Sequence, residues 1–283
     1  IKLRPVLSPL GRDFKAYLAL AAPLMCGQTL LTLDEWYGRW FGGLLAEGTV
    51  AHISYARRLM LVPIGVIGQA FAAAALPTLS KLWAEQKIDE LNKTLRQTLD
   101  TALALAIVAG GGIAVTAPAI VALVYQHGAF DAGDAAVVSG LLFVLAFAIP
   151  AWILQQVIMR AFYARGDTRR PMILGTWIAL LAAPFYYAMA KMFGVSGIVY
   201  AGLAGMSINA LATLLLAGRS HGAPRAGDIL RGQIITFLPA VAAAVTVIVA
   251  APVILPAFSV FSLSDKWSAL LDLIVRGGLF SLV

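Results

Sequence analysis

Apolar residues fill long stretches of this chain, and polar residues gather in short connections between them. A helix needs about 20 consecutive, mostly apolar residues to cross a hydrocarbon core about 30 Å thick. Stretches of that kind recur from one end of the chain to the other. They predict eight membrane-spanning helices, over residues 16–44, 52–80, 94–122, 134–162, 171–192, 196–218, 232–256 and 267–283. The expected fold class is therefore all-α, a polytopic helical membrane protein.

Composition agrees with this pattern. Of the 283 residues, 60% are hydrophobic and 12% are charged, far from the balance of an ordinary soluble domain. The net charge of +7 does not indicate nucleic-acid binding, because the basic residues do not form one stripe. They lie between the apolar stretches, where they indicate topology.

Lys and Arg are distributed very unequally between alternate connections. One side has only Arg39, Lys191 and Lys266. The other side carries fifteen of the 21: Lys2, Arg4, Arg12, Lys15, Lys81, Lys87, Lys93, Arg96, Arg160, Arg165, Arg169, Arg170, Arg219, Arg225 and Arg231. Because cytoplasmic loops of membrane proteins are enriched in Lys and Arg, we expect residues 1–15 and the RGDTRR loop at 165–170 to be cytoplasmic.

Between the second and third spans lies KLWAEQKIDELNKTLR, residues 81–96. Ile88, Leu91 and Leu95 recur at helical spacing, which predicts a short amphipathic helix on the cytoplasmic surface. The first residue is Ile1, and the last apolar stretch runs to Val283. We interpret the chain as a piece of a longer protein.

Two adjacent arginines stand at the head of an apolar run in SYARRLMLVPIGVIGQA, residues 54–70. Arg58, Val62, Gly65 and Gln69 share one helical face, which could line a hydrated cavity, with a bend at Pro63. Snorkelling to the outer interface is the alternative for Arg58. Arg57 points about 100° away, and we expect it to snorkel.

Other charges lie within spans, where ionisable residues are costly and often functional. Glu35 and Arg39 are four residues apart and can form an intrahelical ion pair, whereas Asp34 faces elsewhere. Trp36, Tyr37 and Trp40 are typical of an aromatic belt at the interface. Two further pairs have the same spacing of four residues. Gln156 and Arg160 could line a cavity or form contacts between helices. Asp272 and Arg276 could neutralise each other's charge within the last span.

No pattern in the chain indicates catalysis. The three histidines are scattered, and the sequence has no HExxH, CxxC, P-loop or GxSxG motif. We therefore predict no enzymatic activity, no metal site and no cofactor. From the residues alone, the chain is a multi-helix membrane protein with a possible polar cavity, most simply a transporter.

Four stretches resemble the MurJ/MviN family. ISYARRLMLVPIGVIGQAFAAAALPTLSKL (53–82) is similar to its YADRLxxxPxGVxGxAxxxxLLPxLS signature, and RWFGGLLAEGTV (39–50) to its RxFASxLxxGxV stretch. VYQHGAFDAGD (124–134) and AFYARGDTRRPM (161–172) resemble its GxF loop and its FYARGDTRTPV segment. Order and spacing also match over about 130 residues.

The resemblance implies a flippase of lipid II in bacterial cell-wall synthesis, within the multidrug/oligosaccharidyl-lipid/polysaccharide exporter superfamily. It implies fourteen helices in two six-helix lobes and an extra pair, of which this chain holds spans seven to fourteen. Residues 16–218 would be the C-terminal lobe, and residues 219–283 the two further helices, which form a groove for the prenyl tail. The N-terminal lobe would lie outside this chain.

The resemblance also assigns roles in the site. Arg58 matches a cavity arginine, and its guanidinium would meet the pyrophosphate of a lipid-linked glycan. The expected substrate-binding residues are Arg58, Arg39, Gln69, Gln156 and Arg57, with Asp34 and Glu35 as ion or charge partners.

Departures from the family pattern leave alternatives open. Arg57 stands where the family has an aspartate, Leu61 where many members have a glutamate, and Gly38 where an acid is usual. The alternatives are a flippase for another undecaprenyl-linked saccharide, or a membrane scaffold that no longer transports. In each case, the expected location is the bacterial cytoplasmic membrane, with membrane lipids as partners.

Overall fold

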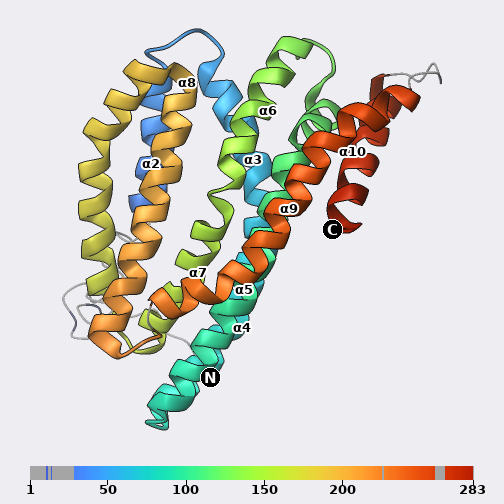
Figure 1. Ribbon diagram of the computed structural model, residues 1–283. Coiled ribbons are helices and arrows are strands. Elements are labelled where there is room, and N and C mark those ends of the chain that lie inside the picture. The colour runs from blue at the N-terminus through green and yellow to red at the C-terminus, as the bar shows by residue number, and fades with distance from the viewer. Residues whose placement is uncertain (1–10, 12–13, 15–28, 225, 259–264, 283) are drawn as a thin grey trace, which may run out of the picture.

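The computed structural model describes residues 11, 14, 29–224, 226–258 and 265–282. Expectations for the other residues, including most of segment 1–15 and the first part of span 16–44, lie outside the described residues. The described part is a bundle of helices (Figure 1). Its elements are α2 (Thr29–Gly42), α3 (Thr49–Pro63), the π-helix η1 (Ile64–Gly68), α4 (Gln69–Ala84), α5 (Ile88–Tyr125), α6 (Ala132–Ala146), α7 (Ile149–Ala164), α8 (Arg169–His221), α9 (Ala226–Phe258) and α10 (Asp265–Leu282).

The predicted spans are recognisable in these helices. Four continuous helical stretches are long and apolar enough to cross a membrane: 49–84, 88–125, 169–221 and 226–252. The pair α6–α7, bent by 44°, makes a fifth. The described residues also form α2 and α10, and α8 consists of two passes for the reason given next. The all-α prediction of a helical membrane protein is confirmed, and the helices follow the predicted segments.

Helix α8 contains a reversal. Gly194 has φ 58° and ψ −134°, a conformation that side-chain-bearing residues adopt only under strain. The two halves of α8 then run back along each other (Figure 1). Consistent with this, a Cβ on Gly202 would lie 3.1 Å from the hydroxyl oxygen of Tyr186, sixteen residues earlier in the chain. The predicted boundary between spans 171–192 and 196–218 is therefore correct.

The proline at position 63 has a consequence that the sequence did not reveal. Instead of a simple bend, Pro63 ends α3, and the next turn is the π-helix η1, which leads directly into α4. π-Turns inside helices are rare and often lie at functional sites. The arginines of α3 and Gln69 of α4 therefore belong to one long, locally widened helical stretch.

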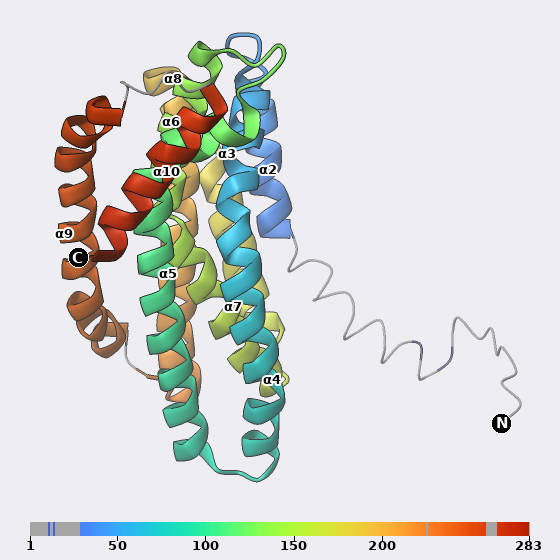
Figure 2. The ribbon, with the colours of Figure 1, turned by 90° about the vertical axis from the view of Figure 1, so that its right-hand side faces the viewer.

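The prediction of a separate surface helix over 81–96 is wrong. Helix α4 continues to Ala84, and α5 begins at Ile88, so this segment is the tip of a hairpin between two long helices (Figure 2). Leu91 and Leu95 are fully buried. Their apolar face packs inside the hairpin and the bundle, so neighbouring helices rather than a membrane remove it from water.

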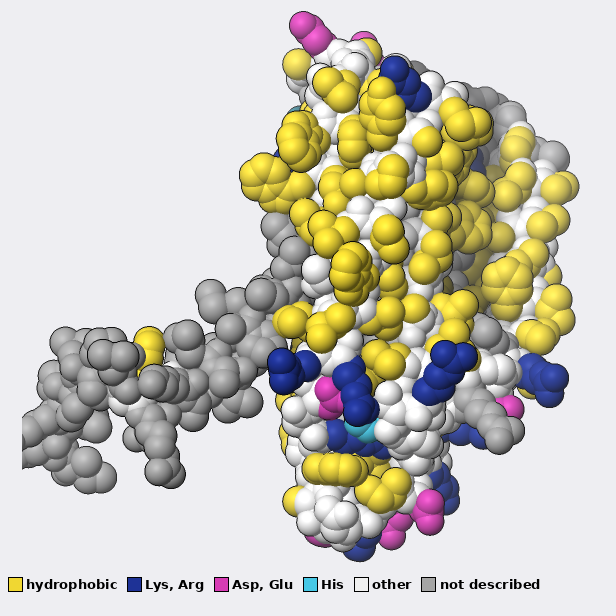
Figure 3. Space-filling view, turned by 90° about the vertical axis from the view of Figure 1, so that its left-hand side faces the viewer, with side chains coloured by type: hydrophobic (Ala, Val, Ile, Leu, Met, Phe, Trp, Pro, Cys, Tyr) yellow, Lys and Arg dark blue, Asp and Glu magenta, His cyan; other side chains and the backbone are white. Residues whose placement is uncertain are grey.

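Three of the basic connections meet at one end of the bundle. Asn92 Nδ2 donates to the carbonyl oxygen of Gly222 at 2.9 Å, and Arg165 Nη2 donates to Asn92 Oδ1 at 3.0 Å. His221 Nε2 lies 3.0 Å from Asp167 Oδ2. Burial lowers the pKa of the Arg165 guanidinium from its ordinary value. Figure 3 shows Lys and Arg gathered below a broad hydrophobic band on one face of the molecule, as expected for a membrane protein.

Helices α9 and α10 lie on one side of α5, whereas α3 and α4 lie on the other (Figure 2). Val247 and Ala251 of α9 pack against Val115 of α5 in a small cluster of their own. The main core lies mostly among α3 to α8, where it includes Met60, Leu142 and Phe162, and it also takes in Ile229 near the start of α9. The last two helices thus contribute little to the main core.

Candidate functional site

A hollow of about 140 Å³ lies between α2 and α3. Gly48, with φ 84°, reverses the chain between these helices, so that the end of α2 lies beside the beginning of α3. The hollow is lined by Glu35, Gly38, Arg39, Val50, Ile53, Ser54, Arg57, Arg58 and Leu61. Four of the predicted site residues, Glu35, Arg39, Arg57 and Arg58, therefore lie together.

Arg58 is exposed on the open side of α3. Its guanidinium carbon lies 6.0 Å from the centre of the Tyr55 ring, which in turn contacts Tyr125 and Phe130. Within the described residues, no carboxylate lies at ion-pair distance from Arg58. A positive charge held by aromatic packing and left without a carboxylate is available to an anion.

The predicted face of Arg58, Val62, Gly65 and Gln69 is exposed throughout. That these four residues share one face stays a prediction, because the π-turn lies between Val62 and Gln69 and changes the helical repeat there. Gln69 does not line the hollow between α2 and α3, because it lies eleven residues further along the helix, about 16 Å at 1.5 Å per residue.

The prediction that Arg57 snorkels to the interface is wrong. Its Nη1 lies 2.6 Å from Asp34 Oδ2, and only 14% of its side chain is exposed. Because α3 begins at Thr49, Arg57 lies two turns inside the helix and faces α2 rather than solvent. The hydroxyl of Tyr186 also donates to Asp34, so one half-buried carboxylate joins α2, α3 and the first half of α8.

Sequence reasoning missed the partners in this cluster. Asp34 was correctly expected to face away from Glu35 and Arg39, but nothing in the sequence connected it with Arg57 or Tyr186. The only available signal was that three polar side chains occur within apolar spans, where such groups usually meet one another.

The predicted pair of Glu35 and Arg39 is confirmed, with Nη2 of Arg39 3.8 Å from Oε2 of Glu35. Both side chains are at least half exposed, so solvent screens the attraction between their charges and the ion pair is weak. Trp36 and Trp40 are exposed beside it, as expected for belt residues. Tyr37 is not a belt residue: it is buried, and its hydroxyl donates to the carbonyl oxygen of Ala179 at 3.1 Å.

Gln156 lies away from the arginines, on α7. Its Oε1 is buried, has no hydrogen-bond partner among the described residues, and lies 2.7 Å from where a Cβ on Gly68 would be. The side chain therefore packs against η1, where a larger residue at position 68 would require it to shift. Arg160, on the same face of α7, lies over the ring of Tyr163.

The charges of the hollow favour an anionic ligand. Three guanidinium groups surround it, and the only carboxylates in contact with them among the described residues are Glu35 and Asp34. Guanidinium groups form forked, charge-assisted hydrogen bonds with phosphate oxygens. Within the described part of the chain, no group of three His, Cys, Asp or Glu residues is placed to hold a metal ion.

Comparison with known proteins identifies similar chains. The family described as "Lipid II flippase MurJ" matches residues 1–273. A probable lipid II flippase MurJ of Rhizobium meliloti (strain 1021) is 29% identical over 175 residues, which is 61% of this chain and 33% of that protein. The lipid II flippase MurJ of Burkholderia cenocepacia is 25% identical over 222 residues, 78% of this chain and 43% of that protein. The chain thus spans less than half the length of these relatives.

Two solved structures share the fold. A lipid II flippase MurJ in an inward closed conformation superposes with a TM-score of 0.72 at 20% identity, over 99% of this chain and 56% of that one. A multidrug resistance MATE family transporter in an outward-facing conformation gives 0.61 at 15% identity, over 96% and 64%. At these identities, the likeness concerns the fold alone.

Proposed function

This chain belongs to the lipid II flippase MurJ family, and we propose that the protein containing it flips lipid II, the lipid-linked precursor of peptidoglycan, across the bacterial cytoplasmic membrane. One observation carries the proposal: among the described residues Arg58 has no carboxylate partner, and it lies at a hollow that two further guanidinium groups line. The family relation supports the substrate class. The geometry supports a site for its pyrophosphate.

The physical difficulty of this transport is the headgroup. A pyrophosphate bearing a sugar and a peptide cannot enter hydrocarbon without losing its hydration, which is very costly for a charged group. Forked hydrogen bonds from Arg58, with Arg39 beside it, would replace part of that hydration. Gln69 and Gln156 would act further along the path, because they lie away from the hollow.

We assign the described bundle to one half of an alternating-access transporter. Residues 16–218 would form a six-helix lobe, and the exposed face of Arg58, Val62 and Gln69 would turn toward a second lobe outside this chain. The end of the bundle that carries the basic connections would be cytoplasmic, because such loops stay on that side.

The hydrocarbon part of the substrate needs its own path. A hollow of about 260 Å³ lies between α5, α9 and the bend from α6 to α7, and its walls are apolar, with Phe147, Phe237 and Val241 among them. We assign the prenyl tail to this surface, in keeping with a role of residues 219–283 as the tail-binding helices.

A second candidate rests on Arg57. Its ion pair with Asp34 neutralises one of the three guanidinium groups that line the hollow, and this changes the charge that a headgroup meets. A flippase for a different undecaprenyl-linked saccharide would share the fold and the pyrophosphate contact but would recognise another sugar.

Complementation separates these candidates. The full-length protein should sustain growth of a bacterium depleted of its own lipid II flippase. Good expression without growth, together with transport of another undecaprenyl-linked glycan in liposomes, would favour the second candidate. Failure to sustain growth, together with no transport of either lipid by the purified protein in liposomes, would contradict both candidates and leave a scaffold.

A further inference from the structure

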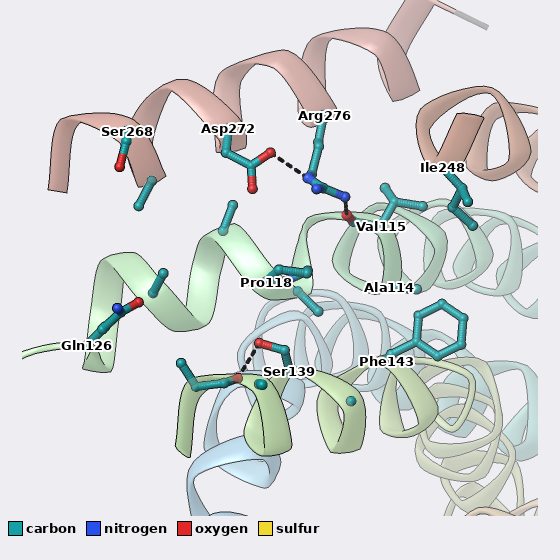
Figure 4. A pocket seen from close by; sticks show the side chains of 17 residues that line it. Ala114, Val115, Pro118, Gln126, Ser139, Phe143, Ile248, Ser268, Asp272 and Arg276 are labelled. Carbon is teal, nitrogen blue, oxygen red and sulfur yellow. Dashed lines mark hydrogen bonds and ion pairs between the residues drawn. The ribbon is translucent and has the colours of Figure 1, made fainter. Parts of the chain in front are cut away.

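A groove of about 740 Å³ lies between α5, α6, α9 and α10 (Figure 4). Its volume is in the range of sites that bind small molecules. Small residues of α5 and α6, among them Ala114, Ala117 and Gly140, leave the space open. The groove shares Ala114 and Phe143 with the apolar hollow between α5 and α9, so the two spaces lie next to each other.

The two ends of this pair of adjacent spaces differ in polarity. Gln126, directly after the last residue of α5, and Ser268, near the start of α10, line the groove at the end remote from the basic connections. Trp267 beside them is 61% exposed, which is typical of a membrane interface. The other end, toward Phe147 and Ala240, is apolar. A ligand with a polar head and a hydrocarbon chain matches this change from a polar end to an apolar end.

An ion pair lies on the wall between these ends. Arg276 Nε donates to Asp272 Oδ1 at 2.6 Å, and Nη1 donates to the carbonyl oxygen of Val115 at 3.4 Å. Both side chains are 19% exposed. Figure 4 shows them reaching from α10 toward α5, with the second carboxylate oxygen of Asp272 directed into the groove and outside the drawn contacts.

The pair restricts the chemistry of the ligand. A pure hydrocarbon would displace the water around both charged side chains and would offer them no hydrogen bonds in its place. A headgroup with negative charge alone would gain from Arg276 but would meet the carboxylate of Asp272. A headgroup that carries a phosphate and an ammonium group can satisfy both side chains at once.

We propose that the groove binds a zwitterionic phospholipid, with its phosphate at Arg276, its ammonium group at Asp272, and an acyl chain along Phe143 and Ile248. A phosphoethanolamine head has this chemistry, and its N–H groups can donate to a carboxylate.

The depth of the pair allows this arrangement. Asp272 and Arg276 follow Trp267 by five and nine residues, about 8 and 14 Å along a helix axis. Helix α10 crosses α5 obliquely, so the depth below the interface is smaller than these lengths (Figure 2). Long charged side chains also extend toward the interface.

The proposal is independent of what the protein transports. It has one consequence for the proposed function: the acyl chain and the prenyl tail would occupy the same hollow between α5 and α9, so that binding of one would exclude the other. Because the proposal does not depend on transport, its test measures lipid binding directly and not transport.

The test uses the full-length protein, delipidated in detergent and exposed to equal amounts of phosphatidylethanolamine and phosphatidylglycerol, with retained lipids counted by native mass spectrometry. We expect wild type to retain phosphatidylethanolamine about tenfold over phosphatidylglycerol, the effect of one charge-assisted hydrogen bond. The double variant D272N/R276Q, which removes both charges, should lose this preference. The control R96Q/D100N removes another pair of the same spacing, at the basic end, and should retain it.

Equal retention of the two lipids by wild type, or a preference for phosphatidylglycerol, would overturn the proposal. A preference that persists in D272N/R276Q would overturn it as well. If that variant does not fold, G140L provides a second test, because Gly140 lines the groove and a Cβ there meets open space. The leucine should fill the groove and reduce phosphatidylethanolamine retention, and unchanged retention contradicts the assignment.

Discussion

Arg57 Nη1 lies 2.6 Å from Asp34 Oδ2, and this ion pair joins α3 to α2 inside the apolar part of the bundle. Both side chains are mostly buried, with 14% and 23% exposed, and the hydroxyl of Tyr186 also donates to the carboxylate. The pair holds Arg57 on one wall of the hollow, whereas Arg58, the next residue, has no carboxylate contact within the described part of the chain. Two adjacent arginines thus have different surroundings.

Replacing Asp34 by asparagine should destabilise the protein strongly. The change leaves the buried guanidinium of Arg57 without a counter-charge, which typically costs about 3–5 kcal/mol. The apparent melting temperature of the purified protein should fall. The double variant D34N/R57Q should recover much of the loss, and a double variant no more stable than D34N would show that the two side chains do not act as a pair.

Gly68 should contribute to the stability of the protein because it has no side chain. A Cβ there would lie 2.7 Å from Gln156 Oε1, so G68A should cost about 1–3 kcal/mol through overpacking. Gly65, in the same π-turn, faces open space, and G65A is the matched control. Thermal unfolding of both variants checks this. Equal stabilities would mean that Gln156 can move away freely.

The reversal in α8 should depend on Gly194. Its backbone conformation is strained for any residue with a Cβ, so G194A should cost about 1–3 kcal/mol. The site itself should be unaffected, because Arg58 lies on another helix. Gly205 has helical geometry and open space around it, so G205A should be nearly neutral in the same unfolding measurement. A neutral G194A would show that the turn relaxes to another conformation.

Much of the fold could be predicted because lipid imposes a simple rule. Spans must be long and apolar, and Lys and Arg gather at one end, so the helices and the basic end of the bundle followed from the pattern. The surface helix at 81–96 was mispredicted because an amphipathic stretch has the same periodicity whether its apolar face meets a membrane or the adjacent helix. Leu91 and Leu95 pack inside the bundle.

The residues of the site could be predicted from the sequence, but which of them contact one another across helices could not. Intrahelical pairs such as Glu35 with Arg39 follow from a spacing of four residues. The contact of Arg57 with Asp34 joins two helices, and its geometry depends on how those helices turn about their axes. The π-turn after Pro63 was also hidden, because a proline predicts a break in the helix but not its form.

The central claim is that Arg58 binds the pyrophosphate of the transported lipid. The most direct test is the rate of lipid II flipping by the purified full-length protein in liposomes, for wild type, R58K and R58A. We expect R58A to lose at least about tenfold in rate, since one charge-assisted contact is lost, and R58K to be intermediate, because lysine keeps the charge but not the fork. Stability should not change, because Arg58 is exposed. A normally folded R58A that flips lipid II at the wild-type rate would contradict the account.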